Sequence, residues 1–126
     1  MLSSSMSKSE STIQKEIRLA LSQYGIVLRL NSGKFWQGKR VWSNEFNQYI
    51  LTGLRPVQGC PEGTSDLLFI GENEIAFIEV KDAKGRLRTE QERFMKVVGD
   101  YGLKVGVARS ADDALKIIGV KDDASE

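Results

Sequence analysis

Two short apolar segments near the middle of the chain carry ionisable side chains at their ends. The first, residues 66–70, follows Gly63-Thr-Ser and opens with Asp66; the second, residues 75–81, ends in Glu79-Val-Lys81. A short polar turn joins the two segments, which predicts a pair of antiparallel strands. Because side chains alternate between the faces of a strand, Glu79 and Lys81 project to the same side. The sequence therefore predicts two acids and a lysine close together at one edge of a sheet.

Burying ionisable groups beside apolar strands is costly unless they have partners. Magnesium takes about six oxygen ligands, which the carboxylates of Asp66 and Glu79, the Val80 backbone carbonyl and waters would supply. Such an ion acidifies a bound water and neutralises charge on a phosphodiester, while the Lys81 ammonium can orient the water or stabilise the pentacovalent phosphorus. Our first hypothesis is therefore a metal-dependent nuclease. The alternative is structural, with Asp66 as a turn residue and Glu79 and Lys81 at an exposed strand end.

The composition limits the catalytic chemistry and the cellular compartment that the chain can have. The length of 126 residues suits one domain, and 40% hydrophobic and 28% charged residues are ordinary globular values. The absence of histidine excludes His-ligated zinc and any Ser-His or Cys-His nucleophilic pair. A net charge of +1 neither supports nor excludes a nucleic-acid partner. The single cysteine, Cys60, fits a reducing compartment, and no apolar run is long enough to span a membrane, so we expect a cytoplasmic protein.

The first half of the chain predicts one helix, one strand and an irregular segment. Residues 1–10 are serine-rich and nearly free of large apolar side chains, which predicts a disordered tail. The first helix is expected after Ser11 as its N-cap, with Gln14 completing a capping box. Residues 26–30 are predicted to form a strand. Residues 31–59 combine glycines with several aromatic side chains, and we expect a hairpin or an excursion from the sheet.

The second half predicts two helices around a further strand. Thr89 is expected to cap one helix, and Ser110 to cap a last short helix that runs to residue 118. Between them, residues 103–108 are predicted to form a strand buried on both faces. The globular part is expected to span residues 11–118, with a polar tail over residues 119–126. This order of elements predicts an α/β fold around a mixed sheet.

Two polar residues lie close to the apolar stripes of the predicted helices. Glu16 stands one position from the stripe of the first helix, and Gln91 shares the packed face of the second with Phe94 and Val98. Both could be boundary residues with solvated tips. The functional alternative is that both point towards the predicted metal, Glu16 as a further acid that acts directly or through a water and Gln91 as a hydrogen-bond donor.

Basic residues gather in two segments, one interleaved with aromatic residues and one directly after Lys81. Either segment could be a solvated loop. The functional alternative is contact with DNA phosphates or bases. The candidate DNA-binding residues are Lys34, Lys39 and Arg40 in the first segment, and Lys84, Arg86 and Arg88 in the second.

The succession of these motifs resembles the PD-(D/E)xK nuclease superfamily and, within it, the virus-type replication–repair nucleases (VRR-NUC domain). The resemblance covers roughly residues 11–118. It rests on Glu16, Asn31-Ser-Gly33, Gly63-Thr-Ser-Asp66-Leu, Glu79-Val-Lys81, Gly85-Arg-Leu, Thr89-Glu-Gln91-Glu-Arg-Phe94 and Val107-Ala-Arg-Ser110.

The resemblance implies a restriction-endonuclease-like fold, a mixed β-sheet flanked by α-helices, and DNA hydrolysis that depends on Mg²⁺ or Mn²⁺. It assigns metal binding to Asp66, Glu79 and the Val80 carbonyl, and catalysis to Lys81 with Glu16 and Gln91 in support. Stand-alone members are typically viral, which fits a phage protein. Small ones act as dimers on branched DNA such as four-way junctions, and we expect a homodimer because one small domain could hardly cut two strands symmetrically.

The chain departs from the family pattern in two places. Ser65 stands where the superfamily name has proline, and residues 43–59 look longer than the compact family form. These differences bear on the contacts with substrate rather than on the metal ligands. A second hypothesis, from another functional class, is a catalytically inactive nucleic-acid-binding or recruitment module with the same fold.

Overall fold

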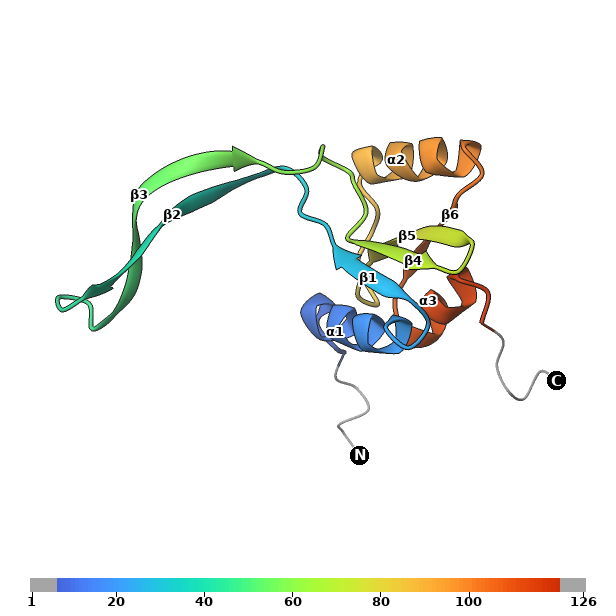
Figure 1. Cartoon of the computed structure of the whole chain (residues 1–126), viewed down its shortest axis with the longest axis horizontal. Coiled ribbons are helices and arrows are strands. Elements are labelled where there is room, and N and C mark those ends of the chain that lie inside the picture. Colours follow the sequence, from blue (N-terminus) through green and yellow to red (C-terminus); the bar gives the residue numbers. More distant parts are fainter. Residues whose placement is uncertain (1–6, 121–126) are drawn as a thin grey trace, which may run out of the picture.

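The computed structural model describes residues 7–120, which form three helices and six strands. Helices lie on both sides of a central sheet, and one pair of strands stands away from it (Figure 1). In chain order the elements are α1 (Glu10–Leu21), β1 (Ile26–Arg29), β2 (Lys34–Ser43), β3 (Gln48–Gln58), β4 (Leu67–Gly71), β5 (Glu74–Val80), α2 (Thr89–Asp100), β6 (Lys104–Ala108) and α3 (Ala111–Ile117).

The central sheet has the strand order β1-β4-β5-β6 and is mixed. Strands β1, β4 and β5 are antiparallel neighbours, while β6 runs parallel to β5 after the connection through α2. In the register of β4 and β5, Leu67 lies opposite Ile78. Asp66 and Glu79 are the next residues outward from this pair, so the two acids occupy the same end of neighbouring strands.

The core lies between the sheet and the helices α1 and α3. Helix α1 buries Ile13, Ile17 and Leu21, which recur every fourth residue and therefore form one stripe. These side chains pack with the alternate residues of the strands that point to the same face. Val120 also packs against this core, while residues 121–126 of the predicted polar tail lie outside the described residues. The other buried members of the core are Leu67, Phe69, Ala76, Ile78, Val80, Ala108, Ala114 and Ile118.

Helix α1 begins before its predicted cap. Ser9, not Ser11, is the N-cap, and its hydroxyl accepts a hydrogen bond from the Thr12 backbone N–H at 3.1 Å. Both serines suit a cap by residue type, but the earlier start places Glu10 in the first turn, where a negative charge stabilises the helix dipole. Glu10 thus belongs to the helix rather than to the predicted tail, most of which lies outside the described residues.

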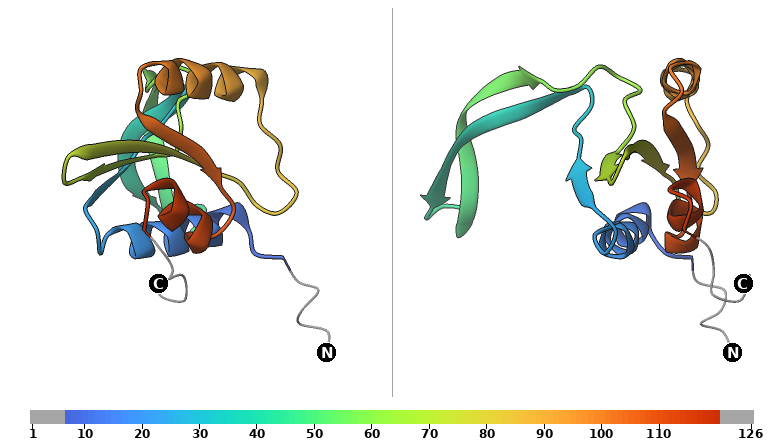
Figure 2. Two further views of the ribbon diagram at one scale, coloured as in Figure 1. Left: turned by 90° about the vertical axis from the view of Figure 1, so that its right-hand side faces the viewer. Right: turned by 45° about the vertical axis from the view of Figure 1, so that its right-hand side comes forward.

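Helix α2 covers part of the opposite face of the sheet (Figure 2). Its Phe94 ring meets the Phe77 ring of β5 edge to face, with the centroids 5.2 Å apart. Thr89 is the first helical residue and Arg88 the N-cap, so the predicted cap is displaced by one residue. The reason is Gln91, whose side-chain oxygen accepts a hydrogen bond from the Arg88 backbone N–H at 2.9 Å.

The strands β2 and β3 form a long antiparallel ribbon that pairs with no other described strand. At its base, the two flanking segments are joined to each other by hydrogen bonds from the Gly33 N–H to the Cys60 carbonyl and from the Cys60 N–H to the Asn31 carbonyl, at 2.8 and 2.7 Å. Figure 1 shows the ribbon curving away from the sheet. The expectation of a hairpin within residues 31–59 is confirmed, and the sheet itself has the predicted mixed α/β architecture flanked by helices.

The loop before β4 requires glycine at residue 63. Gly63 has a φ of +91°, in the left-handed region that favours glycine. A Cβ there would also lie 2.4 Å from the Glu90 carbonyl oxygen in the first turn of α2. The loop can therefore pass close against α2, which brings Asp66 and Gln91 to the same end of the sheet.

Candidate active site

Asp66 and Glu79 occupy adjacent strands at the edge where the sheet register predicts them to meet. Asp66 is half-buried, and its Oδ2 accepts a hydrogen bond from the Val80 backbone N–H at 2.8 Å. In an extended strand the N–H and C=O of one residue point to the same side. The Val80 carbonyl therefore faces the Asp66 side as well, so the three predicted ligand groups converge.

Glu79 is almost fully buried, at 2% relative exposure. Gln91 Nε2 donates a hydrogen bond to Glu79 Oε2 at 2.9 Å, and Lys81 Nζ lies 3.7 Å from the same oxygen. The other oxygen, Oε1, is buried without any hydrogen-bond partner within the described part of the chain. A buried carboxylate oxygen without a partner is costly, and such a group in a native protein calls for an explanation.

The electrostatic surroundings make Glu79 a weak acid. Burial, and after it the charge of the nearby Asp66 carboxylate, together raise the pKa of Glu79 to about 8. The Lys81 ammonium opposes this shift, while the charge of Glu10 adds to it. Two carboxylates that share one low-dielectric edge cannot both ionise cheaply, and a positive ion between them would remove that penalty.

The cation fits the groups present. Hard divalent ions prefer carboxylate and carbonyl oxygens, which are the groups that Asp66, Glu79 and Val80 bring together. The unpartnered Oε1 of Glu79 is a lone-pair donor that nothing else among residues 7–120 satisfies. No group of three or more acidic or cysteine side chains gathers within those residues, so waters would complete the coordination of any bound ion.

A cleft of about 440 Å³ opens beside Asp66. Glu10 lines it from the start of α1, and Arg29, Asn31 and Phe35 line it from β1 and the base of the ribbon. Glu10 and Arg29 are charged groups that sequence reasoning did not assign to the site. The signal for Glu10 was present in the sequence, because Ser9 followed by an acid is a good helix start.

Glu16 does not line the cleft beside Asp66. Its carboxylate forms an ion pair with Lys8 at 2.8 Å, and it lines a separate hollow together with Ala83 and Arg109. The structure thus brings Gln91 to Glu79 and does not bring Glu16 to the cleft beside Asp66. Glu10 and Glu16 are six positions apart on α1, and of these two acids only Glu10 lines this cleft.

The predicted basic residues fall on two separate surfaces. Lys84, Arg86 and Arg88 are exposed on the connection between β5 and α2. Asp82 shapes this connection, because its Oδ1 accepts hydrogen bonds from the backbone N–H groups of Lys84 and Gly85 at 3.0 and 2.6 Å. The other three basic residues lie exposed on the ribbon, well away from that connection in the chain: Lys34, Lys39 and Arg40.

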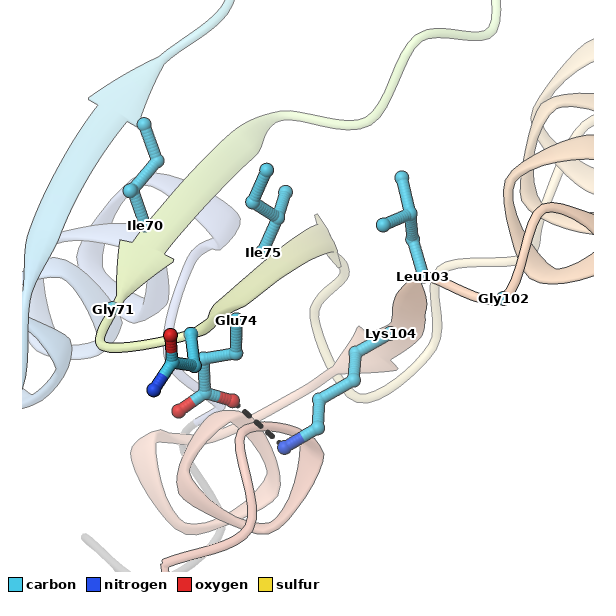
Figure 3. Close-up of a pocket in the computed structure, with 8 residues that line it drawn as sticks. Ile70, Gly71, Glu74, Ile75, Gly102, Leu103 and Lys104 are labelled. Atoms are coloured by element: carbon cyan, nitrogen blue, oxygen red, sulfur yellow. Dashed lines mark hydrogen bonds and ion pairs between the residues drawn. The ribbon is translucent and has the colours of Figure 1, made fainter.

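A second hollow, at the opposite end of the strands, offers different chemistry. It is lined by the β4–β5 turn and the residues before β6, and its volume is about 510 Å³ (Figure 3). Its lysine, Lys104, is already paired with Glu74 at 2.7 Å and also donates to the Ile118 carbonyl. Figure 3 shows Ile70, Ile75 and Leu103 pointing to one side of the sheet. This hollow is apolar surface rather than a catalytic site.

An α/β sheet with two acids and a lysine at one edge defines a nuclease of the PD-(D/E)xK class. Comparison with known families then identifies the chain itself. It matches the VRR-NUC domain over residues 8–112, which is most of its length, and it therefore belongs to the VRR-NUC family of nucleases. A comparison with curated proteins gives no match. No helix in residues 7–120 is long and apolar enough to cross a membrane.

The raised pKa of Glu79 predicts that the ion-free protein loses stability as the pH rises. The folded state binds the Glu79 proton more tightly than the unfolded state, so this contribution is complete below the ordinary glutamate pKa of 4.5 and is lost as the pH passes about 8. In EDTA, the melting temperature should fall between about pH 5 and about pH 9. The change corresponds to a few kcal/mol of unfolding free energy, on the order expected for such a shift.

Glu79→Gln is the control for this prediction, because it keeps the shape and removes the ionisation. The variant should melt at nearly constant temperature over the same pH range and should be more stable than the wild type at its alkaline end. A wild-type melting temperature that rises with pH in EDTA would contradict the assignment of a buried, protonated Glu79.

Proposed function

We propose that this protein is a divalent-metal-dependent DNA endonuclease with Asp66, Glu79 and the Val80 carbonyl as its metal ligands. The observation that carries the proposal is the buried Oε1 of Glu79, a carboxylate oxygen without a partner beside a second carboxylate. A bound Mg²⁺ or Mn²⁺ would supply charge neutralisation on a phosphodiester and make water more acidic. The family membership supports nuclease activity in general.

The protein groups around the ligands have separate roles in this proposal. Gln91 holds the Glu79 carboxylate through its hydrogen bond to Oε2, and the Val80 N–H holds Asp66. Lys81 presents a mostly buried ammonium beside Glu79, where it can stabilise negative charge on the phosphoryl oxygens as a water oxygen attacks and the sugar oxygen leaves. Gln91 and Val80 act here as positioning groups, while Lys81 contacts the reacting phosphate.

Glu10 takes the role that the sequence assigned to Glu16. It lines the cleft with Asp66 and contributes to the raised pKa of Glu79, so its negative charge reaches the pair. We therefore include Glu10, and not Glu16, among the acids that act on the cation or on its waters. The exposed position of Glu10 suits a contact through water rather than a direct bond.

The alternative function is a nucleic-acid-binding or recruitment module whose site no longer cuts. Such a module would gain nothing from a buried pair of acids, which costs folding free energy unless a cation relieves it. The exposed Lys84, Arg86 and Arg88 suit phosphate contacts in either case, because they lie on the connection that directly follows Lys81. DNA binding is expected of both functions, so only a cleavage assay distinguishes the nuclease from the binding module.

The cleavage test compares Lys81→Met with Lys96→Met on plasmid DNA and on a four-way junction. Lys96 is a matched control, because its ammonium lies on the solvent face of α2 and pairs only with Asp100. With Mg²⁺ or Mn²⁺, the wild type and Lys96→Met should cut, whereas Lys81→Met should lose at least about a hundredfold in rate. EDTA should stop all cleavage. A folded wild type that leaves both substrates intact with either metal would favour the non-catalytic module.

The two glutamates of α1 give a second matched pair in the same assay. Glu10→Gln should slow cleavage at least about tenfold, because it removes a charge that faces the pair. Glu16→Gln should leave the rate within about twofold of the wild type, because only its ion pair with Lys8 at the surface is lost. The reverse order of effects would return the supporting role to Glu16.

We further propose that the protein acts as a symmetric homodimer on branched DNA such as four-way junctions. Helix α2 leaves part of its face of the sheet uncovered, and apolar side chains remain exposed there. They include Ile26 at 60%, Leu28 at 43% and Ile75 at 40% exposure, with Leu103 beside them at 37%. A contiguous apolar surface of this kind supports an interface with a second copy. Two sites related by a twofold axis could then cut two strands.

The interface predicts a dimer that a single charge disrupts. Leu28→Asp should convert a dimer of the wild type into a monomer, as measured by light scattering at concentrations used for cleavage, because it places a charge in an apolar contact. Leu19→Asp is the control, since Leu19 is 71% exposed on α1, on the other side of the sheet. A wild type that scatters as a single chain would rule out the dimer and leave the nuclease proposal standing.

A further inference from the structure

The β2–β3 ribbon exposes more apolar surface than an isolated pair of strands can keep in water. Neither strand has more than a marginal contact with any other described helix or strand. A hairpin without a third strand or a covering helix is only marginally stable. The ribbon therefore presents a surface that suits a partner. Its exposed large apolar residues are Phe35, Trp36, Trp42, Phe46, Tyr49, Leu51 and Leu54.

The charge of the ribbon identifies the class of partner. Between residues 34 and 58 the chain has four cations, Lys34, Lys39, Arg40 and Arg55, and one acid, Glu45, which gives a net charge of +3. The whole chain carries +1, so the remaining residues carry −2. Two such ribbons would repel each other, whereas a polyanion would be attracted. Cations interleaved with exposed aromatic rings are the usual composition of a surface that binds single-stranded nucleic acid.

The outer half of the ribbon holds its rings in a fixed arrangement. Trp42 lies opposite Tyr49 across the strands, and Arg40 lies opposite Leu51, so these four side chains share one face. The Trp42 and Tyr49 rings meet edge to face with centroids 5.1 Å apart, and the Arg40 guanidinium lies 3.7 Å from the Tyr49 centroid. The Trp42 indole N–H donates to the Asn44 side chain at 3.0 Å.

These rings are pre-organised and at the same time accessible. Trp42 is 50% and Tyr49 56% exposed, so each can still accept a flat partner. Unpaired bases stack on aromatic side chains regardless of their sequence, whereas the bases of a duplex are already stacked on one another. The face formed by Arg40, Trp42 and Tyr49 therefore suits an unpaired strand better than a duplex.

The ribbon also has a defined position relative to the acids. A bulge, where Gly38 lies between residues opposite Arg55 and Thr52, bends the ribbon, and Gly53 adopts a φ of +62° there. At its base, Phe35 lines the same cleft as Asp66. Ten or eleven extended residues reach about 33–37 Å at the usual rise per residue. The base of the ribbon therefore borders the cleft, although Phe35 projects to the other face of β2 from Arg40 and Trp42.

We propose that the β2–β3 ribbon is a docking arm for the unpaired strand of the DNA substrate. Arg40, Trp42 and Tyr49 stack on bases, and Lys34, on the same face of β2, contacts a phosphate along the arm. Lys39 projects to the other face, where it adds positive charge. This inference rests on the proposed nuclease function and names the feature of the substrate that the enzyme recognises beyond the scissile phosphate: single-stranded DNA that adjoins a duplex.

Intrinsic fluorescence tests the arm directly, because both tryptophans of the chain, Trp36 and Trp42, lie on the ribbon. The full chain is titrated in EDTA with a short oligothymidine and, separately, with a blunt duplex of equal nucleotide content. The single strand should quench the tryptophan emission saturably and bind at least about tenfold more tightly than the duplex, because only its bases are free to stack. Raising the salt concentration should weaken both complexes.

Tyrosine variants separate stacking from charge. Tyr49→Leu should weaken oligothymidine binding about tenfold, measured by anisotropy of a labelled oligonucleotide, whereas Tyr49→Phe should restore it. Tyr101→Leu is the matched control, because this tyrosine is 78% exposed beyond the end of α2 and should leave the affinity unchanged. A far-ultraviolet circular dichroism spectrum of the Tyr49→Leu variant without DNA that matches the wild type shows that the ribbon is intact.

Three results would overturn the proposal that the ribbon docks an unpaired strand. They are equal affinity for the single strand and the duplex, equal losses in Tyr49→Leu and Tyr101→Leu, and a tryptophan emission that changes with protein concentration alone, which would mean that a second copy covers the ribbon. Plasmid cleavage measured in parallel distinguishes the two proposals. If the protein cuts plasmid but does not prefer single strands, the docking role of the ribbon is rejected and the nuclease proposal stands. If it binds single strands through Tyr49 but does not cut, the docking role is supported and the nuclease proposal is rejected.

Discussion

The structure depends on a carboxylate that is buried without enough partners. Glu79 lies at the end of a core strand, and one of its oxygens has no hydrogen-bond partner among residues 7–120. The Asp66 carboxylate beside it makes ionisation still harder. This arrangement does not stabilise the fold, because an apolar side chain at the same position would cost less folding free energy. In the proposed function, a cation at the edge of the sheet would relieve this penalty by binding between the two carboxylates. The unfavourable burial is thus the physical basis of the proposed activity.

The surrounding elements hold this pair from several directions. The turn between β4 and β5 sets the register that places Asp66 beside Glu79. Gly63 lets the loop before β4 pass against the start of α2, and Gln91 in that first turn bonds both to its own helix start and to Glu79. Helix α2 is therefore coupled to the site through one carboxamide. The core on the other face, built by α1 and α3, keeps the sheet edge rigid.

Sequence reasoning found the parts of the site that depend on local rules. Strand alternation and a short turn were sufficient to place Asp66, Glu79 and Lys81 together, and helical spacing was sufficient for Gln91. Local rules do not decide what depends on packing. Glu10 and Glu16 are both acids on one helix, and the docking of that helix on the sheet places Glu10, not Glu16, at the cleft beside Asp66. The ribbon was foreseen as a hairpin, but no local rule says whether a hairpin joins the sheet or projects from it.

The proposed function requires that Asp66 and Glu79 bind a divalent cation. Calorimetric titration of the wild type with Mn²⁺ at neutral pH, in two buffers of different ionisation enthalpy, tests it most directly. We predict saturable binding with the release of about one proton per ion, because the ion displaces the proton that the raised pKa keeps on Glu79. Asp66→Asn should abolish the binding heat. A folded wild type that binds no Mn²⁺, or binds it equally well without Asp66, would contradict the account.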